Sequence, residues 1–399
     1  MKKQKIIFFL LFVAVAVGGL IISGVQANDT ASRKIVIFQA GVADTAKDNI
    51  INKAGGAKFK DLDLVRGKAV WLSNKAAEKL AKQPGVLRVE DDIIVQALEN
   101  FNSEKVTGKA KIPPQPSQVL PWGIDKIDAE KVWASSTADL INVGIIDTGI
   151  SNNHPDLLAN VKGGINTIQP RKSWNDDNGH GSHVAGIVAA LNNSVGVVGA
   201  GPNIDLYAIK VLNSAGSGFL SDIIEGLQWA INNNMQVVNL SLGASTGNQS
   251  FHDAIIATKN AGIVVVAAAG NSGGSVIFPA AYPEAIAVSA IDINNAIASW
   301  SSRGPEVDLA APGVSIYSTY KGTAYATLSG TSMASPHVAG AAALVLSMPV
   351  GSFDTNNNGK WDPDEVQTKL QATATDLGSG GFDNLYGFGL VNAFAATRP

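Results

Sequence analysis

The sequence predicts an α/β protein whose main domain is a mostly parallel sheet with helices on both faces, preceded by a small α+β unit. From residue 140 onward, apolar stretches of strand length alternate with helical patterns, which is typical of a parallel sheet covered by helices. Before residue 97, strand and helix patterns follow in the order βαββαβ. The 399 residues are enough for one large and one smaller domain.

Segment 1–27 is predicted to be a signal peptide. Lysines at positions 2, 3 and 5 precede an apolar run over 6–23, and small residues up to Ala27 offer a cleavage site. An uncleaved membrane anchor is the alternative, because the apolar run is nearly long enough to span a bilayer. The polar chain that follows favours cleavage. We therefore expect a secreted protein that has no membrane contact once the signal is removed.

Residues 28–98 form the predicted small unit, and residues 99–117 a polar linker or flexible arm. The linker holds three prolines near its end and shows no apolar period. The expected elements of the small unit are strand 34–38, helix 45–54, strands 57–64 and 68–72, helix 75–83, and strands 87–90 and 93–95.

Residues 118–399 form the predicted main domain. In sheets of this kind the functional site lies beyond the carboxyl ends of the strands, where Asp147, Asn239 and Asn271 are placed. Ser221 is expected to cap the helix that follows it. The expected strands are 141–146, 206–212, 237–242, 263–269 and 285–291, and the expected helices are 180–191, 222–233, 250–261 and 332–348.

The composition excludes several classes of function. The formal net charge is −3 and no basic run occurs, which argues against a nucleic-acid partner. The chain has no cysteine, so disulfides and thiol chemistry are not available to it. For an exported protein without disulfides, bound metal ions are the remaining cross-link, and Ca²⁺ is the favoured candidate.

Three glycine-flanked blocks each present one polar residue beside a strand or a helix. These residues are Asp147, His180 and Ser332. Together they supply a carboxylate, an imidazole and a hydroxyl, the groups that make a serine nucleophilic at neutral pH. Ser332 is expected to open a helix, whose N-terminus favours negative charge forming beside it. The blocks span 143–149, 180–186 and 330–336.

Each of these residues has a plainer explanation when it stands alone. A serine at a helix start is most often an N-cap. His183, one turn after His180, suggests a two-histidine metal site, but that motif needs histidines four residues apart with a glutamate between them. A single Asp-Thr-Gly does not make an aspartic protease, which needs two copies. The three blocks together outweigh these alternatives, and we expect His183 and His337 to be structural.

The blocks, in the order Asp, His, Ser, resemble the subtilase family of subtilisin-like serine proteases, and the resemblance covers nearly all of 118–399. It implies a serine endopeptidase that hydrolyses protein and peptide substrates through an acyl-enzyme. Segment 28–98 resembles the family's ferredoxin-like inhibitory propeptide, which implies a zymogen whose propeptide acts as inhibitor and folding aid. We also expect a monomer, and self-cleavage between Leu98 and Glu99.

The resemblance also assigns residues that bind substrate. Asn271 follows a buried strand and resembles the family's oxyanion-hole asparagine; an ordinary turn asparagine is the alternative. Segment 277–279 would close the floor of the S1 pocket. The segments involved contain no acidic residue, which argues against a requirement for Lys or Arg at the P1 position of substrates. The residues expected to bind substrate are Gly216, Ser217, Gly218, Ser241, Leu242, Gly243, Ala268, Ala269 and Gly270.

Two structural calcium sites of different kinds are expected. The first is implied by the resemblance, and the loop 191–197 is its most specific part. Its ligands would be Gln118, Asp156, Leu191, Asn193, Val195 and Val197. The second follows from the residues themselves, because 354–365 satisfies the EF-hand loop pattern D-x-[DN]-x-[DN]-G-x₅-E. Its ligands would be Asp354, Asn356, Asn358, Lys360, Asp362 and Glu365.

An asparagine-rich turn followed by a capped helix is the alternative for this loop. Asp362 would be the N-cap, Pro363 the first helical residue, and Glu365 would complete a capping box. Both interpretations hold at once if the loop ends inside its exiting helix, as EF-hand loops do. Most of the family lacks this loop.

Two rival functions stand beside the general endopeptidase. One is an enzyme devoted to processing particular partner proteins, and the other is a catalytically silent binding or structural protein that keeps the fold. Every catalytic position is intact, so we expect an active endopeptidase.

Overall fold

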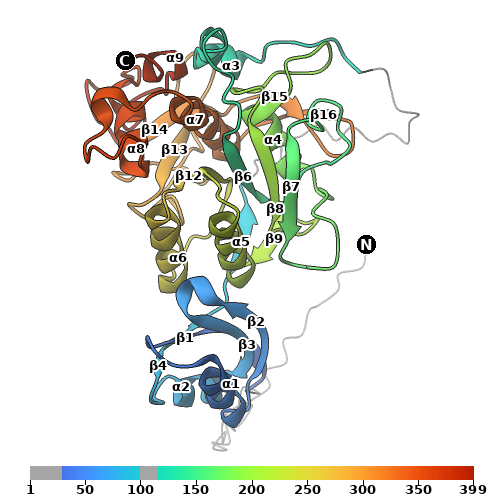
Figure 1. The fold of residues 1–399 in the computed structure, drawn as a ribbon, viewed down its shortest axis with the longest axis vertical. Helices are drawn as coiled ribbons and strands as arrows, with labels where there is room; N and C mark the ends of the chain where they lie inside the picture. The colour runs from blue at the N-terminus through green and yellow to red at the C-terminus, as the bar shows by residue number, and fades with distance from the viewer. Residues whose placement is uncertain (1–28, 99–114) are drawn as a thin grey trace, which may run out of the picture.

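The computed structural model describes residues 29–98 and 115–399. Figure 1 shows a small unit at one end of the molecule and a larger α/β domain above it. The predicted signal peptide 1–27, Glu99 and most of the linker 99–117 lie outside the described residues. Within the two described ranges, none of the helices is long and apolar enough to cross a membrane.

The small unit has the predicted βαββαβ order. Its four strands form an antiparallel sheet in the order β2-β3-β1-β4, with two helices on one face. The elements are β1 (Ala31–Phe38), α1 (Asp44–Lys53), β2 (Ala57–Leu62), β3 (Gly67–Ser73), α2 (Asn74–Leu80) and β4 (Val86–Asp91).

Seven parallel strands form the main sheet of the large domain, in the order β14-β13-β12-β10-β6-β8-β7. These strands are β6 (Asn142–Asp147), β7 (Val161–Asn166), β8 (Asp205–Lys210), β10 (Val237–Leu240), β12 (Val264–Ala268), β13 (Ile286–Ile291) and β14 (Leu309–Pro312). The helices are α3 (Trp122–Lys126), α4 (His180–Ala189), α5 (Leu220–Asn232), α6 (Gln249–Asn260), α7 (Thr331–Leu346), α8 (Pro363–Ala372) and α9 (Ala393–Ala396).

Helices cover both faces of this sheet, as predicted. Along β6, Val143 and Ile145 pack with α4 and α7, whereas Ile146 faces the opposite side and packs with α5 and α6. Because both faces of the inner strands are buried, β10, β12 and β13 consist mainly of apolar residues. Helix α7 is buried from Thr331 to Val345, which agrees with its nearly all-apolar sequence.

Two further sheets are small. The hairpin β15 (Ile316–Thr319) and β16 (Tyr325–Leu328) lies beside α4. A three-stranded sheet in the order β11-β5-β9 joins the small unit to the large domain, because β5 (Ile94–Ala97) lies between β9 (Ser217–Phe219) and β11 (Leu242–Gly243).

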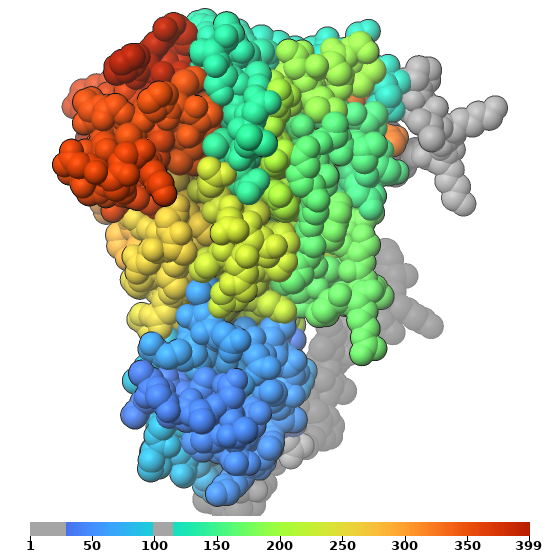
Figure 2. Space-filling model, in the orientation of Figure 1, coloured from blue at the N-terminus to red at the C-terminus, as the bar shows by residue number. Residues whose placement is uncertain are grey.

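The small unit packs against α5 and α6, as the space-filling view in Figure 2 shows. In β1, Val36 and Phe38 point to α1 and α2, whereas Ile35 and Ile37 join the core that includes α5 and α6. A single antiparallel sheet therefore carries two apolar faces, and the large domain covers one of them.

Two expectations about the elements were wrong, and two strands of the main sheet were missed. The strand predicted over 93–95 does not close the small unit, because as β5 it pairs with the large domain. Ser221 is not an N-cap, since α5 begins at Leu220 and Phe219 occupies the cap position. Strands β7 and β14 were not expected; β7 contains two glycines and β14 ends in proline, which both weaken a strand pattern.

Candidate active site

The predicted carboxylate and imidazole meet at the carboxyl end of β6. His180 Nδ1 lies 2.8 Å from Asp147 Oδ1 and 2.9 Å from Oδ2, and both side chains are completely buried. Gly181 permits this approach, because a Cβ at that position would lie 2.2 Å from the Gly149 carbonyl oxygen. The residue after the histidine must therefore be glycine if the helix is to lie this close to the strand end.

A buried carboxylate that the sequence analysis missed anchors the start of α4. Asp176 accepts hydrogen bonds from Gly179 N at 2.9 Å and from Ser182 N at 2.9 Å, near the N-terminus of the helix that begins with His180. Thr148 connects this anchor to β6, since its hydroxyl donates to Asp176 and accepts from Gly181 N, both at 2.9 Å. Burial raises the pKa of Asp176, and these hydrogen bonds oppose that rise.

Ser332 lies in the first turn of α7 and is also completely buried. Its hydroxyl donates to the Ser241 carbonyl oxygen at 3.0 Å, and the Ser241 hydroxyl donates to the Ser332 carbonyl oxygen at 2.9 Å. Pro336 explains the second bond. A proline has no N–H, so it cannot make the usual helical bond to the carbonyl four residues earlier, and Ser241 satisfies that carbonyl instead.

The Asn271 side chain binds the backbone of Leu98, which follows strand β5. Its Nδ2 donates to the Leu98 carbonyl oxygen at 2.8 Å. Its Oδ1 accepts from Thr331 N at 2.9 Å and from the Thr331 hydroxyl at 2.8 Å, which fixes the amide so that Nδ2 faces Leu98. Thr331 thus orients the Asn271 amide. It lies inside the 330–336 block, but nothing in the sequence distinguished it from the other residues of that block.

Gly330 allows the Leu98 carbonyl group to lie close to the backbone just before α7. A Cβ on Gly330 would lie 2.8 Å from the Leu98 carbonyl oxygen and 3.2 Å from Asn271 Nδ2. A larger residue would therefore displace the carbonyl from the amide that binds it.

Both predicted substrate-binding edges pair with residues 94–98. On one side Val95 is in register with Gly218, and Ala97 N donates to the Gly216 carbonyl at 2.8 Å. On the other side, Leu242 is in register with Ala97, and Leu98 N donates to the Ser241 carbonyl at 3.3 Å. The three-stranded antiparallel arrangement is that of a peptide bound as an added strand. Ser217 and Gly243 complete the two edges opposite Gln96.

The third predicted edge, Ala268 to Gly270, bonds to Ile277 and to Thr331. Ala269 accepts a hydrogen bond from Ile277 N at 3.0 Å, and Gly270 N donates to the Thr331 hydroxyl at 3.1 Å. The next residue, Phe278, pairs with Ala244 through two backbone bonds. The segment 277–279 therefore lies between the two walls, where the sequence analysis expected the pocket floor.

The two histidines expected to be structural are buried and bonded to backbone carbonyls. His183 Nε2 lies 3.0 Å from the Ile316 carbonyl oxygen, and burial lowers the pKa of His183 to about 3. His337 Nδ1 lies 2.8 Å from the Met333 carbonyl oxygen, and burial lowers its pKa to about 4. Both rings are therefore neutral at physiological pH and serve packing.

Residues of the first predicted calcium site converge around Asp156. Its carboxylate is completely buried and accepts from Asn193 Nδ2 at 2.9 Å, from Val197 N at 2.8 Å and from the Tyr325 hydroxyl at 3.3 Å. Gln118 reaches the same loop, since its Oε1 accepts from Asn193 N at 2.8 Å. A buried carboxylate whose bonding partners are all neutral fits a neighbouring cation. The carbonyl ligands expected here, from Leu191, Val195 and Val197, belong to this loop.

The second predicted site is a compact loop before α8. Asp354 accepts from Asn358 N and Gly359 N, both at 2.9 Å. The side-chain amides of Asn356 and Asn358 both donate to Asp362, and Lys360 N donates to Asn358 Oδ1. Hydrogen bonds thus link Asp354, Asn356, Asn358 and Asp362 within one short loop, and all four side chains carry oxygen atoms of the kind that bind a hard cation.

The capped-helix alternative also describes this loop. Pro363 opens α8 after the N-cap Asp362, and Glu365 accepts from Asp362 N at 3.0 Å and from Thr355 N at 2.7 Å. Among the described residues, no three His, Cys, Asp or Glu side chains form a metal-binding cluster. Any calcium here would rely on amide and carbonyl oxygens beside the carboxylates.

A parallel α/β sheet with a buried Asp–His pair and a helix-opening serine at its carboxyl edge defines a serine hydrolase. Comparison with known proteins agrees. The family model described as "Subtilase family" matches residues 139–389. Subtilisin E of Bacillus subtilis (strain 168) is 39% identical over 413 residues, and the match covers 100% of both proteins.

Two other relatives match over shorter ranges. Alkaline protease of Alkalihalobacillus alcalophilus is 45% identical over 332 residues, covering 83% of this chain and 79% of that protein. Subtilisin Savinase of Lederbergia lenta is 49% identical over 284 residues, covering 71% of this chain and all of that protein. The chain belongs to the subtilase family. It is a subtilisin-like serine endopeptidase that acts on protein substrates, and its N-terminal unit is the propeptide region of a zymogen.

Proposed function

We propose that Asp147, His180 and Ser332 form the catalytic triad. The Asp147 carboxylate accepts a hydrogen bond from the Nδ1–H group of His180, so that the lone pair on Nε2 serves as the base. The Ser332 hydroxyl turns from the Ser241 carbonyl toward the imidazole, gives up its proton there and attacks the scissile carbonyl carbon. His180 then protonates the leaving amine as the acyl-enzyme forms, and water repeats the sequence to release the acid.

The single observation that carries this proposal is the hydrogen bond from Asn271 Nδ2 to the Leu98 carbonyl oxygen. An oxyanion-hole donor must reach the oxygen that becomes negative in the tetrahedral intermediate, and this donor already holds the carbonyl of an extended peptide in the cleft. The backbone N–H of Ser332 is the second proposed donor. Thr331 orients the asparagine and is not itself a catalytic residue.

The cleft selects substrates by backbone pairing and apolar contacts. Residues 94–98 occupy the positions that we assign to substrate residues P5 to P1. Val95, at P4, is completely buried in a cluster that includes Leu220 and Leu242. Leu98, at P1, presents an apolar side chain, and the strands around it carry no charge. We therefore assign a preference for apolar residues at P4 and P1.

This placement of Leu98 supports self-cleavage between Leu98 and Glu99. The chain would be a signal peptide over 1–27, a propeptide over 28–98, and a secreted mature enzyme made of the arm 99–117 and the catalytic domain 118–399. After cleavage the propeptide stays bound as an inhibitor, because its last strand fills the cleft and two of its carboxylates bind catalytic-domain helices. Glu90 accepts from Ser250 N at 3.1 Å near the start of α6, and Asp92 accepts from Ser221 N at 2.8 Å near the start of α5.

Calcium would stabilise the mature enzyme at both predicted sites. At the first, a cation would compensate the buried charge of Asp156, with Gln118, Asn193 and carbonyls of the 191–197 loop as further ligands. At the second, it would neutralise Asp354, Asp362 and Glu365 and tie the loop to α8. Because the chain has no cysteine, these ions would provide cross-links that disulfides cannot.

A covalent inhibitor tests the proposed nucleophile. The purified enzyme is incubated with phenylmethylsulfonyl fluoride, and both casein hydrolysis and the mass of the peptide containing Ser332 are measured. We expect activity to disappear in proportion to a single adduct on Ser332. An adduct on another residue, or full activity in a fully modified enzyme, would overturn the assignment. N-terminal sequencing of the mature protein, expected to begin at Glu99, tests the cleavage position.

A further inference from the structure

The propeptide's pairing with the catalytic domain extends beyond the residues nearest the cleavage point. Ile94 is in register with Phe219, and Leu220 N then donates to the Ile93 carbonyl oxygen at 2.9 Å. One residue further on, the Asp92 carboxylate meets Ser221. The chain from Asp92 to Leu98 therefore follows the catalytic domain without a break. If cleavage occurs after Leu98, Asp92 is the seventh residue before the scissile bond.

Helix α5 has no N-cap side chain of its own. Its cap position is Phe219, which has no side-chain acceptor, so the first N–H groups of the helix need an outside partner. Asp92 supplies it: Ser221 N donates to Oδ1 at 2.8 Å, and the Ser221 hydroxyl donates to Oδ2 at 2.9 Å. Ser221 is completely buried in this state. The carboxylate thus fills a position that the catalytic domain leaves open.

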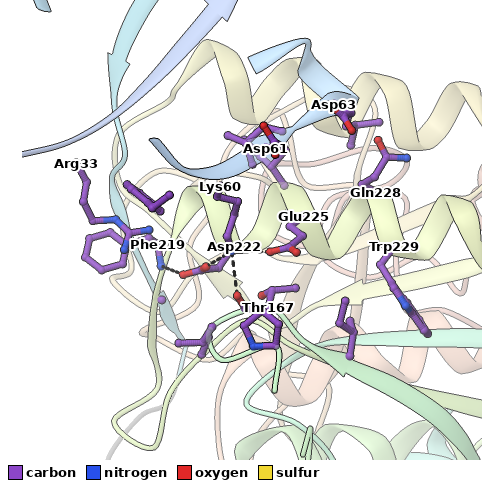
Figure 3. Close-up of a pocket in the computed structure, with 18 of the residues that line it drawn as sticks. Arg33, Lys60, Asp61, Asp63, Thr167, Phe219, Asp222, Glu225, Gln228 and Trp229 are labelled. Atoms are coloured by element: carbon purple, nitrogen blue, oxygen red, sulfur yellow. Dashed lines mark hydrogen bonds and ion pairs between the residues drawn. The ribbon is translucent and has the colours of Figure 1, made fainter. Parts of the chain in front are cut away.

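The other partners of this carboxylate belong to the propeptide and leave with it. Arg33 Nε lies 2.7 Å from Asp92 Oδ2, and its guanidinium stacks 3.7 Å from the centroid of the Phe219 ring. Figure 3 shows Arg33 beside Phe219, and Lys60 close to Asp222 and Glu225. These residues line a cavity of about 920 Å³. Ser221 and the α5 N-terminus remain on the mature enzyme.

We propose that the mature enzyme has a substrate subsite for a carboxylate seven residues before the scissile bond, with Ser221 as its specificity-determining residue. The proposal rests on the proposed cleavage after Leu98, which sets the count. A substrate that pairs along the cleft as 93–98 does would place its seventh side chain on Ser221 N and Oγ. The α5 dipole favours a negative group at this position. Once Lys60 has left with the propeptide, the negative charges of Asp222 and Glu225 reduce the preference for a carboxylate. Asp222 accepts from Phe219 N, so it does not compete for Ser221 N.

Two peptide p-nitroanilides test the subsite. They share the sequence of residues 93–98, and one carries Asp and the other Ala at the preceding position. The enzyme is the full chain after self-processing and separation from its propeptide. We expect kcat/KM for the Asp peptide to exceed that for the Ala peptide about fivefold, the size of one helix-capping interaction.

Two variants localise the effect. Ser221→Ala keeps the N–H group but loses the hydroxyl, so the preference for the Asp peptide should fall to about twofold. Ser250→Ala is the matched control: Ser250 is also the second residue of its helix but contacts Glu90 and not Asp92, so the preference should stay at about fivefold.

Equal kcat/KM values for the two peptides, or a preference unchanged by Ser221→Ala, would overturn the subsite while leaving the proposed function intact. If neither peptide is hydrolysed although casein is, the proposed alignment of 94–98 with substrate positions fails, and the subsite fails with it.

Discussion

Thr331→Val tests whether the orientation of Asn271 matters for catalysis. The substitution keeps the shape of the side chain but removes the hydroxyl that donates to Asn271 Oδ1 and accepts from Gly270 N. In subtilisin, loss of an oxyanion-hole donor costs about 10²–10³ in kcat. Thr331→Val leaves that donor in place and leaves the Thr331 N–H bond at 2.9 Å, so only part of its orientation is lost.

One hydrogen bond contributes about 1 kcal/mol, which corresponds to about fivefold in rate. We therefore expect Thr331→Val to lower kcat about 5- to 10-fold with little change in KM, measured with an apolar tetrapeptide p-nitroanilide. The buried Gly270 N–H loses its acceptor, so the melting temperature should also fall. Thr331→Ser, which keeps the hydroxyl, is the control and should restore kcat.

A double variant distinguishes a loss of Asn271 orientation from a general disturbance of the active site. If Thr331 acts through Asn271, then Thr331→Val should cost almost nothing in an Asn271→Ala background. Additive losses in the double variant, or a wild-type kcat in the single variant, would refute the reasoning.

Three further outcomes follow from the structure. For the double variant Asp354→Asn, Glu365→Gln, chelation of calcium should lower the melting temperature by less than it does for wild type, with little effect on kcat. A double variant that melts like wild type at every calcium concentration would show that the loop is only a capped turn. The pKa of His183 is lowered from its ordinary value to about 3 in the folded protein, so at lower pH the unfolded state binds a proton that the folded state does not, and stability should be lost as pH falls below about 6.5. In an inactive Ser332→Ala background, the melting temperature of the protein with His183 should therefore approach that of the His183→Gln variant as pH drops from 7 to 4. A difference in melting temperature that stays constant over this range would contradict the expectation. Val95→Asp in an isolated propeptide should weaken inhibition about 100-fold, because it buries a charge in an apolar cluster; unchanged inhibition would show that the P4 contact is unimportant.

The sequence predicted the fold class and the layers because strands buried on both faces consist mainly of apolar residues. The same rule failed for the edge strand β7, where two glycines and a lysine hide the pattern. A strand was predicted at β5, but its pairing was not, because its partners are more than 100 residues away in the chain.

The blocks around Asp147, His180 and Ser332 were visible because each combines a polar residue with glycines at fixed positions. Thr331 and Asp176 were not, because their importance depends on hydrogen bonds to residues distant in the chain, and a threonine or an aspartate in a loop has no periodic signal. Ser221 was misjudged as an N-cap, since the acceptor for this helix comes from Asp92, far away in the propeptide.

Self-cleavage by the refolded full-length chain tests the central claim most directly. Wild-type protein and a Ser332→Ala variant are refolded with no other protease present, and their masses are followed with time. In subtilisin, loss of the serine lowers kcat about 10⁶-fold, so we expect wild type to be cut between Leu98 and Glu99 while the variant stays intact. Cleavage of the Ser332→Ala chain at the same bond and a comparable rate would contradict the assignment of Ser332 as the nucleophile.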